Sequence, residues 1–422
     1  MIYKMYELKK SVSYPLIVLI CIFIGFNFLL ISEKLYVREE LDSLNKIIDE
    51  VGYKIDDEML EKLDKYYNDK LKKFNNLNHK KTNKIYKSID DFFEKNKYQI
   101  EEVMDGYTDE EKELLDDLRV IEFYYDLINP LKAQYKNIDI IELGEEQIEM
   151  NKLSGQAAET VRTQYRKFND RFYEIIKNKE HINLFLFGKS NRMHLFLFRD
   201  LLKTIMFEVM IIVVLITSYL INYEFNNKTF VLIYTTRKGR NLIKDKLFTA
   251  LIISVLVTTV IMGITLGVYF IVFDYSRLLN VPINSVFNWE LKTPFMSWFK
   301  MSYGKFLLCS IGLVYAIELV FVGIAVVLSE LIRNNYVVFF VFLILAGICY
   351  MLPSIIPGST KLIFLSVLTP FSLVWGSVFW FMESGALTII KYYELITLGV
   401  WACILIILIK LCIKRFKHQN IY

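Results

Sequence analysis

Residues 204–223 read TIMFEVMIIVVLITSYLINY, and residues 247–273 read LFTALIISVLVTTVIMGITLGVYFIVF, with the basic segment 224–246 between them. Each apolar run is long enough to cross a bilayer as a helix, which takes about 20 residues. A helix satisfies its own backbone amide and carbonyl groups, which find no other partners in hydrocarbon. The two runs therefore predict a pair of transmembrane helices joined by a short polar loop.

Further apolar runs lie at 14–31, 306–328, 336–352 and 395–409, the last extending to Cys412. The chain of 422 residues is 54% apolar and 15% aromatic, so we predict an all-α, polytopic membrane protein. A net charge of +4, unevenly placed along the chain, does not favour a nucleic-acid partner. The five cysteines all fall within predicted spans, which leaves no disulfide framework.

The first run follows Lys4, Lys9 and Lys10, as the core of a secretory signal would. It is too long for that role, and no small-residue cleavage pattern follows it. We interpret it as an uncleaved anchor with the N-terminus inside. Residues 1–32 are then an N-terminal interfacial segment followed by the first span.

Residues 33–198 are rich in charged residues, asparagine and tyrosine and contain no run that could span a membrane. Apolar side chains recur there at helical spacing, as in Leu153, Ala157, Val161, Tyr165, Phe168, Phe172 and Ile175. Helix breakers divide the segment into four to six helices: Gly52, Gly106, Pro130, Gly144 and Gly155. A segment of this length buries its own core. We predict an all-helical extracellular domain inserted between spans one and two.

Residues 199–422 hold five further spans, and the number of crossings depends on the segment 362–382. This segment is long enough to cross, but Pro370 and Gly376 interrupt it. If it crosses, the basic C-terminal tail lies outside, against the positive-inside tendency. If it dips in and returns, both termini and the basic loop lie in the cytoplasm. We therefore predict six transmembrane helices plus a re-entrant hairpin.

The loop 224–246 reads EFNNKTFVLIYTTRKGRNLIKDK and gathers six lysines and arginines around Gly239. Topology alone explains such charge, because basic residues keep a loop in the cytoplasm. It does not explain FVLIY, an apolar stretch too short to cross, followed by a turn and a second helical start. We predict a helix, a glycine turn and a helix that present an apolar face and several charges to a soluble partner.

The residues of this loop occur in an order seen elsewhere. Glu224, Thr229, the run 232–236, Arg240 and Lys246 occupy positions found in the membrane subunits of type-2 ABC exporters, which the chain resembles from about Thr204 to its end. Lys228 stands where a glycine is usual, and the usual proline is missing. The sequence LTPF at 368–371 resembles the family's Thr-Pro segment between the fifth and sixth spans. A large domain between the first two spans resembles one branch of the family.

The resemblance implies that the loop docks into a separate cytoplasmic ABC ATPase, through Glu224, Thr229, Arg237, Lys238, Gly239, Arg240 and Lys246. That ATPase would bind ATP and magnesium, and this chain would carry no cofactor. The chain is expected to pair with a second permease copy, identical or different, and to lie in membrane lipid. The expected function is export of an amphipathic substrate such as an antimicrobial peptide, drug or lipid. Two alternatives stay open: a mechanotransmitting or sensing subunit whose outer domain does the work, and an ion-extruding permease.

No enzymatic activity is expected of this chain itself. The sequence LFGKS at 186–190 lacks the first glycine of a phosphate loop, because Asn183 stands there. No Ser-His-Asp arrangement is present. The histidines show no metal-like spacing: His79, His181, His194 and His418. We predict no catalytic or metal site. The bias toward Lys, Asn, Ile and Tyr is typical of an AT-rich genome, so the expected location is a bacterial plasma membrane.

Three polar residues within the predicted spans are candidates for an intramembrane polar or substrate site. Glu318 lies near the middle of the fourth span, where a charge costs about 3 kcal/mol on insertion scales. A substrate or proton contact and a structural hydrogen bond are both open for it. Glu208 is about one turn from the predicted outer end of its span, and we expect it to reach the interface beside Lys203 and Arg199. Asn27 is expected to hydrogen-bond between helices.

Overall fold

The structure is a computed structural model that describes residues 14–184, 195–234, 239, 242–285, 296–383 and 385–418. Over these residues the chain is helical, and extended backbone forms only isolated bridges. Six described helices are long and apolar enough to cross a membrane. They are α2 (Tyr14–Ser32), α11 (Leu202–Asn226) with the preceding π-helical turn η2 (Phe196–Leu201), α13 (Leu242–Val272), α14 (Tyr303–Leu331), α15 (Asn335–Ile355) and α18 (Tyr393–His418). The prediction of an all-α, multi-pass membrane protein is confirmed.

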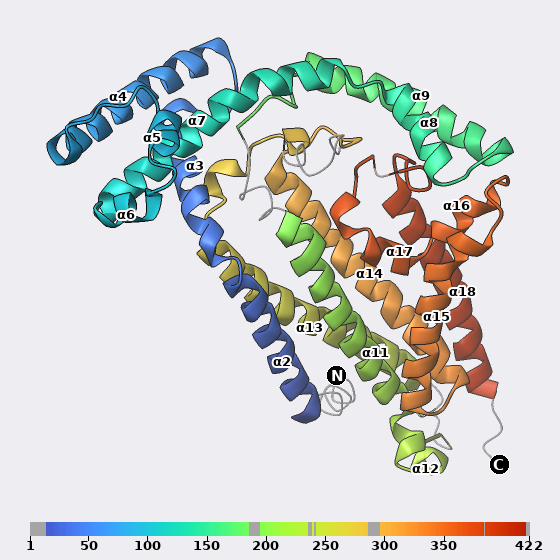
Figure 1. Cartoon of the computed structure of the whole chain (residues 1–422). Coiled ribbons are helices and arrows are strands. Elements are labelled where there is room, and N and C mark those ends of the chain that lie inside the picture. Colours follow the sequence, from blue (N-terminus) through green and yellow to red (C-terminus); the bar gives the residue numbers. More distant parts are fainter. Residues whose placement is uncertain are drawn as a thin grey trace.

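The six long helices form one bundle, with α11 and α14 at its centre (Figure 1). α11 packs against α13, α14 and α15, and α14 also packs against α18. Both central helices are apolar on all sides and buried, as expected of helices surrounded by others. α2 lies at the edge of the bundle against α13 and α11, and most of its apolar side chains are exposed.

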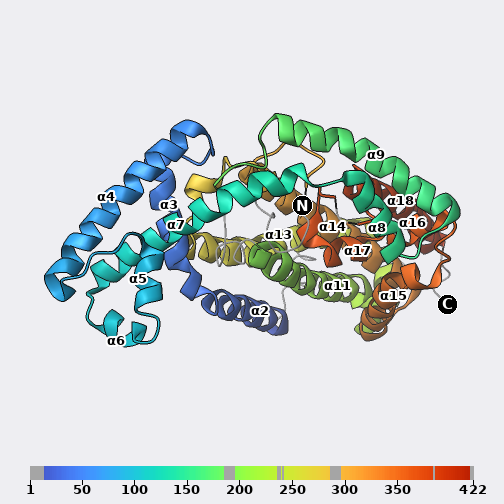
Figure 2. The same cartoon turned by 45° about the horizontal axis from the view of Figure 1, so that its top comes forward.

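A helical layer lies across one end of the bundle (Figures 1 and 2). Its helices are α3 (Arg38–Val51), α4 (Asp57–Thr82), α5 (Ile89–Lys95), α6 (Ile100–Asp105), α7 (Asp109–Lys136), α8 (Ile140–Met150) and α9 (Gly155–Lys177). We call these helices the α3–α9 layer. The prediction of four to six helices was too low, because α5 and α6 are only seven and six residues long and carry no periodic pattern. The short helix α12 (Phe230–Tyr234) lies at the opposite end of the bundle.

Two of the predicted helix breakers do not end a helix. Pro130 lies inside α7, and Gly144 lies inside α8. Gly144 is required there because a Cβ atom would come within 2.8 Å of the Tyr165 ring on α9. The glycine therefore allows α8 and α9 to pack closely. Gly52 does end α3, with a left-handed φ of 83° that favours glycine.

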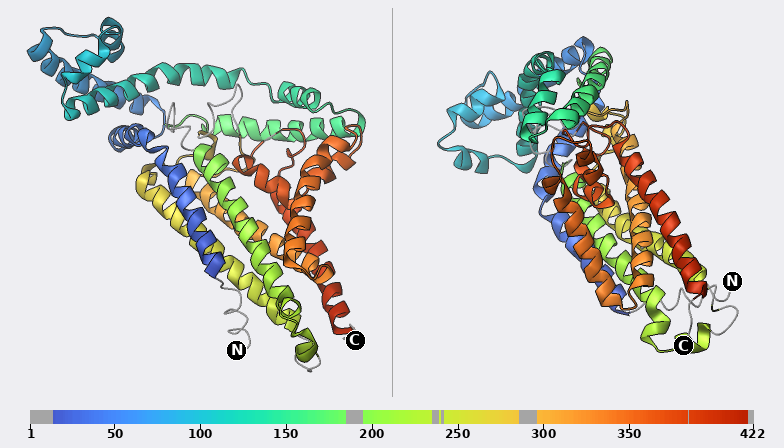
Figure 3. Two further views of the ribbon diagram at one scale, coloured as in Figure 1. Left: turned by 60° about the horizontal axis from the view of Figure 1, so that its bottom comes forward. Right: turned by 90° about the vertical axis from the view of Figure 1, so that its right-hand side faces the viewer.

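One part of the layer extends beyond the bundle as an arm formed by α4, α5, α6 and the first half of α7 (Figure 3). The arm has a hydrophobic core of its own, distinct from the core that runs through the layer and the bundle. Its buried members are Leu71, Phe74, Tyr86, Ile89, Phe92, Tyr107, Leu115 and Leu118. The arm is thus a separately packed unit attached to the rest of the layer through α3 and α7.

The segment 362–382 contains no helix long enough to span. It forms α16 (Leu362–Val367), α17 (Pro370–Trp375) and the turn η6 (Ser377–Phe379), all at the end of the bundle that carries the layer. Pro370 occupies the first turn of α17, and the Thr369 hydroxyl caps that helix by accepting from the Ser372 amide at 3.0 Å. Gly376 ends α17. Six long helices place the start of α2 and the end of α18 at the same end of the bundle, beside α12 (Figure 1).

Candidate functional site

The first candidate site is the turn that joins α11, α12 and α13. The Thr229 amide donates to the Glu224 carbonyl at 2.9 Å, which closes the end of α11 before α12 begins. Lys228, just before it, has a left-handed φ of 55°. Glycine adopts this conformation at no steric cost, and other residues adopt it less often. Lys228 adopts it here and closes the turn.

A buried ion pair closes the base of this turn. The Lys246 ammonium donates to the Glu224 carboxylate, and also to the carbonyls of Leu220 at 2.7 Å and Ile221 at 2.9 Å. The side chains of Lys246 and Glu224 are 3% and 0% exposed. Both were predicted to belong to a docking loop, but their side chains face the protein interior. Their role in the structure is to hold the two ends of the loop together.

Apolar side chains attach α12 to the bundle. The rings of Phe225 and Phe230 stack with centroids 5.0 Å apart, and the Arg333 guanidinium lies over Phe225 at 4.3 Å. Ile233 packs against a small cluster that joins the start of α13 to the end of α18, formed by Leu242, Ile243 and Phe416. The position of α12 is therefore fixed by α11, α13 and α18 together.

The other face of α12 is exposed. Val231 and Leu232 are 46% and 76% exposed, while Gly239 is buried. Arg237, Lys238 and Arg240 lie outside the described residues. This end of the bundle thus presents two adjacent apolar side chains on a short helix that is itself firmly attached. Such a surface suits a shallow apolar groove on a partner.

Sequence reasoning missed several residues around this site. Asn222 donates to the Ile332 carbonyl at 3.2 Å, which joins the end of α11 to the end of α14. Glu330 lies within electrostatic reach of Lys246, Arg333 and Arg415. These residues lie at the ends of different spans, so their proximity follows only from the helix packing. The signal in the sequence for this group was the acid Glu330 and the arginine Arg333, which flank the end of the fourth span.

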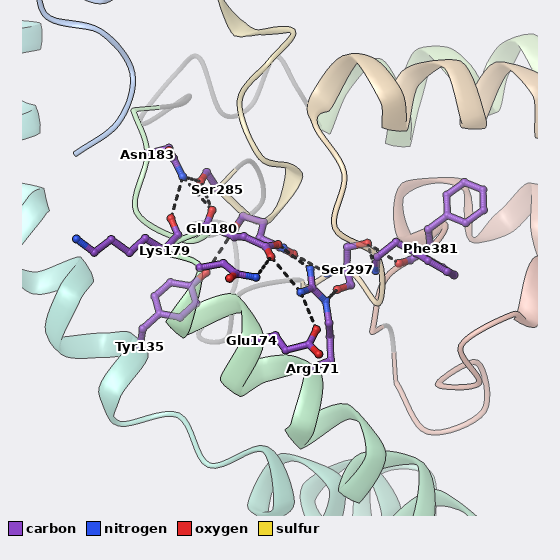
Figure 4. Close-up of polar contacts among 12 residues, drawn as sticks. Tyr135, Arg171, Glu174, Lys179, Glu180, Asn183, Ser285, Ser297 and Phe381 are labelled. Carbon is purple, nitrogen blue, oxygen red and sulfur yellow. Dashed lines mark hydrogen bonds and ion pairs between the residues drawn. The ribbon is translucent and has the colours of Figure 1, made fainter. Parts of the chain in front are cut away.

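A second polar cluster, which sequence reasoning also missed, joins the layer to the bundle (Figure 4). Arg171 on α9 donates to both carboxylate oxygens of Glu180, at 3.0 and 2.6 Å, and its Nε donates to the Ser297 carbonyl at 3.2 Å. The Asn284 amide donates to the same carboxylate at 2.6 Å. Ser297 in turn donates to the Phe381 carbonyl at 2.9 Å. Residues from three distant parts of the sequence are therefore connected around one buried ion pair.

The signal for this cluster was present in the amphipathic stripe of α9. Arg171 lies three residues after Phe168 and four before Ile175, on the face that the stripe predicts to be buried. Its side chain is 7% exposed, and that of Glu180 is 3% exposed. An arginine on a buried helical face needs a paired acceptor.

Other contacts fix the layer at both ends. The Asn45 amide donates to the Asp274 carbonyl at 2.8 Å, beside α13. At the far end, the Ser154 amide donates to the Gly358 carbonyl at 3.0 Å, beside α15. The Tyr165 hydroxyl hydrogen-bonds the partly buried carboxyl of Glu383, and desolvation raises the pKa of that carboxyl above its ordinary value. The layer is therefore attached along the whole width of the bundle.

A cavity of about 310 Å³ opens between α3, α5 and α7, close to the end of α2. Its walls combine carboxylates with exposed aromatic rings and one guanidinium: Tyr36, Glu39, Glu40, Asp90, Asp116, Arg119, Val120, Phe123 and Asp126. An acidic rim beside an aromatic wall suits a group that carries positive charge next to an apolar portion.

The intramembrane residues lie in two places. The Asn27 amide on α2 donates to Glu208 at 2.8 Å and to the Thr265 hydroxyl at 3.2 Å. Glu208 is only 4% exposed, so the expectation that it reaches the interface beside Lys203 and Arg199 was wrong. The continuous helix begins at Phe196, not Thr204, which places Glu208 about 18 Å along it. Glu318 on α14 is 2% exposed and lies elsewhere in the bundle, without a hydrogen-bond partner among the described residues.

Among the described residues, no three His, Cys, Asp or Glu side chains come together as a metal site would require. His181 is buried with its ring 4.4 Å from that of Tyr135, which is a packing contact. Comparison with protein-family models, curated proteins and solved structures finds no match for this chain. The features that indicate a function are the geometry of these sites and the order of residues in the loop.

Proposed function

We propose that this chain is the permease subunit of a type-2 ABC exporter, driven by a separate ATPase. The observation that carries the proposal is the attached helix α12 between the second and third long helices, with Val231 and Leu232 exposed. A loop that only determines topology requires neither an ordered helix nor a buried ion pair at its base. A helix held by three spans transmits a push from a soluble partner to those spans.

In this proposal α12 and both termini lie in the cytoplasm, and the α3–α9 layer lies outside. The basic residues of the loop and of the C-terminal tail support this orientation through the positive-inside tendency. The segment 362–382 is then a re-entrant hairpin on the outer side. Its short helices are supported by protein contacts, since Phe371, Leu373 and Val374 are buried.

ATP and Mg²⁺ bind to the partner ATPase, and two permease copies with two ATPases form the working unit. A single bundle of six helices has α11 and α14 packed at its centre, so the substrate path lies between copies. The substrate is an amphipathic molecule such as an antimicrobial peptide, drug or lipid. The acidic and aromatic cavity between α3, α5 and α7 supports an amphipathic substrate over a purely apolar one.

Site-specific photocrosslinking in membranes of the native host tests the proposal. A photoreactive residue at Leu232 is expected to capture a soluble protein that contains a Walker A sequence and hydrolyses ATP. The matched control is Ile85, an apolar residue of the layer that is 68% exposed and is expected not to capture this protein. Equal capture at both positions, or capture at Leu232 of a protein without ATPase activity, would contradict the proposal.

A second candidate is a mechanotransmitting subunit, in which the spans move the layer and no substrate crosses. The observation that favours it is the attachment of the layer through Arg171, Asn45 and Ser154 to three different parts of the bundle. Reconstituted vesicles distinguish the two candidates. ATP-dependent movement of a labelled amphipathic substrate supports export. ATP-dependent change in distances between spin labels on the layer, without substrate movement, supports mechanotransmission.

A further inference from the structure

The cavity of about 310 Å³ lies where three helices of the α3–α9 layer pack together (Figure 1). α3 and α5 each pack against α7, and all three helices contribute residues to its walls. Tyr36, in the turn η1 (Leu35–Val37), belongs to the same wall and follows the end of α2 by four residues. The cavity therefore opens beside the place where the first long helix continues into the layer.

Residues that do not line the cavity hold its walls in place. Asp117 on α7 pairs with Lys70 on α4 at 2.6 Å and with Lys46 on α3 at 3.6 Å. The Glu122 carboxylate, also on α7, accepts from the Ile89 amide at the start of α5 at 2.9 Å. The helices around the cavity are therefore joined to one another by buried and partly buried polar contacts.

One face of α7 supplies most of the lining. Residues three or four positions apart lie on the same face of a helix. The lining residues of α7 follow this spacing: Asp116, Arg119, Val120, Phe123 and Asp126. Apolar side chains lie in the middle of this face, and a carboxylate lies at each end. The face therefore suits a ligand that combines charged and apolar groups.

The cavity carries an excess of negative charge. Five carboxylates against one guanidinium give its lining a formal charge of −4, although the whole chain carries +4. Carboxylates gathered in one cavity repel one another, and they attract cations from solution. The charge of the lining thus favours a cationic ligand over an anionic or neutral one.

The carboxylates are spread out, which distinguishes between kinds of cation. Among the described residues, no three carboxylate, histidine or cysteine side chains come close enough together to hold a metal ion. Asp116 and Asp126 are ten residues apart, which is about 15 Å along α7. A lipid head group such as ethanolamine carries a single ammonium and does not reach both. A peptide with several basic side chains matches this spread.

Exposed aromatic rings lie among the carboxylates. Phe123 is 39% exposed and Tyr36 is 58% exposed. The faces of such rings attract ammonium and guanidinium groups, and they also pack against apolar side chains. The volume of the cavity is near the lower end of the range for ligand pockets, about 300 Å³, so it admits one or two side chains of a larger molecule.

We propose that this cavity binds a cationic amphipathic peptide. Basic side chains of the peptide lie against the carboxylates, and an apolar side chain packs against Phe123 and Tyr36. The inference names a class of ligand and its site on the layer. That the same peptide is exported rests on the proposed function, whereas its binding requires no ATPase.

Equilibrium binding of a fluorescent peptide to the purified full-length chain tests the site. The chain is placed in phosphatidylcholine nanodiscs, whose lipids carry no net charge, and empty nanodiscs give the background. A peptide of alternating lysine and leucine is expected to bind saturably, and less tightly as salt is added. A peptide of alternating glutamate and leucine is expected not to bind. A peptide of alternating lysine and glycine is expected to bind several-fold less tightly, because it lacks apolar side chains.

Two variants of the cavity locate the binding. The triple variant Glu39→Gln, Asp90→Asn and Asp126→Asn removes one carboxylate from each helix, and it is expected to weaken binding of the lysine–leucine peptide about tenfold. Phe123→Ala is expected to weaken it about threefold. Gel filtration identifies a variant that fails to fold, and Phe123→Ala tests the site if the triple variant does.

The matched control removes three exposed carboxylates from α8, at the other end of the layer (Figure 1): Glu142→Gln, Glu146→Gln and Glu149→Gln. It changes the net charge by the same amount as the triple variant of the cavity. Its affinity for the lysine–leucine peptide is expected to equal that of the unaltered chain.

Absence of saturable binding to the unaltered chain overturns the proposal. Unchanged binding in both cavity variants also overturns it, as does an equal loss in the two triple variants, which would show a general effect of charge. Equally tight binding of the lysine–glycine peptide overturns the amphipathic character of the ligand. The assay contains neither ATPase nor ATP, so its failure is separate from a failure of crosslinking at Leu232.

Discussion

Lys246 donates to the carboxylate of Glu224 across the base of the loop that joins α11 and α13, and both side chains are almost fully buried. The two residues stand at the two ends of the basic segment. Their pairing therefore sets the separation of α11 and α13 where α12 is attached. The charges nearest to the spans, on Glu224 and Lys246, are therefore structural, and it is the exposed face of α12 that we propose meets the ATPase.

Lys246→Ala is expected to destabilise the chain by about 3–5 kcal/mol, because it leaves the Glu224 carboxylate buried without its partner. Unfolding in detergent, followed by circular dichroism, measures this change. The control is Lys244→Ala, an exposed neighbour, with an expected change within about 0.5 kcal/mol. Combining Lys246→Met with Glu224→Gln should recover much of the loss, since no charge then stays buried. Equal stability of the two single lysine variants would contradict the structural role.

Replacement of Arg237, Lys238 and Arg240 by glutamate is expected to prevent assembly with the ATPase or to uncouple ATP hydrolysis from transport. The reason is that reversed charge repels a surface that the basic loop is proposed to fit. Copurification and ATPase activity of the complex are the measurements, and protease protection reports membrane insertion, which should be unchanged. Normal assembly together with normal coupling would argue against docking through this loop.

Arg171→Ala is expected to loosen the contact between α9 and the segments around Asn284 and Ser297. It leaves the Glu180 carboxylate buried without its bidentate partner, at a cost of about 3–5 kcal/mol. Hydrogen exchange should become faster at α9 and at both segments. Arg166→Ala is the matched control, because Arg166 on the same helix is 63% exposed and its nearest carboxylate is 3.6 Å away. Similar exchange in the two variants would contradict the prediction.

His181 predicts a loss of stability in acid. Burial lowers its pKa from the ordinary value of 6.5 to about 4. The unfolded chain therefore binds this proton first, so the stabilisation is complete above pH 6.5 and is lost as the pH falls toward 4. The total change is at most about 3 kcal/mol, at 1.36 kcal/mol per pKa unit.

Unfolding measured from pH 7 to pH 4 tests this prediction by comparing the native chain with His181→Gln. The difference between them isolates His181, because Glu383, whose pKa is raised, contributes in the opposite direction in both. His79→Gln, at an exposed position on α4, is the control. A pH profile that His181→Gln leaves unchanged would show that His181 does not contribute.

Gly358→Ala is expected to weaken the attachment of the layer at its far end. A Cβ atom at Gly358 would come within 2.8 Å of the Lys152 carbonyl, so the backbone must shift and the bond from the Ser154 amide lengthens. The expected cost is about 1–3 kcal/mol, measured as faster amide exchange at the start of α9. Gly312→Ala is the control, since nothing lies within 4 Å of a Cβ there. Unchanged exchange in Gly358→Ala would mean that the contact is not maintained in solution.

The apolar pattern of the sequence predicts the bundle, because few structures other than a membrane span require a long continuous run of apolar residues. It also predicts the short helix at FVLIY and the break at Pro370. The apolar pattern does not predict helices that are too short to show a repeat, such as α5 and α6. It also places a helix end wrongly where a glycine such as Gly144 is required for close packing. An error in the predicted start of a span also misplaces the residues within it. Because the helix begins at Phe196, Glu208 lies in the interior of the bundle and not at the interface.

The candidate sites are harder to predict than the fold, because they form between elements. Arg171 and Glu180 are nine residues apart, yet their further partners come from segments more than a hundred residues away. Glu224 and Lys246 were identified from their order in the loop, but order does not tell a buried side chain from an exposed one. Only the packing of α11 against α13 shows that they face each other.

The connection between α2 and α3 has a mechanical consequence. Only residues 33–37, which include the short turn η1 (Leu35–Val37), separate the first long helix from α3, which packs against α4 and α7. The 26 residues of α4 make a helix about 39 Å long. A change of about 5° in the direction of a rigid helix of that length moves one end relative to the other by roughly 3 Å, by simple geometry. A spectroscopic probe at the end of α4 would therefore report a tilt of α2 that is carried through η1 into the arm.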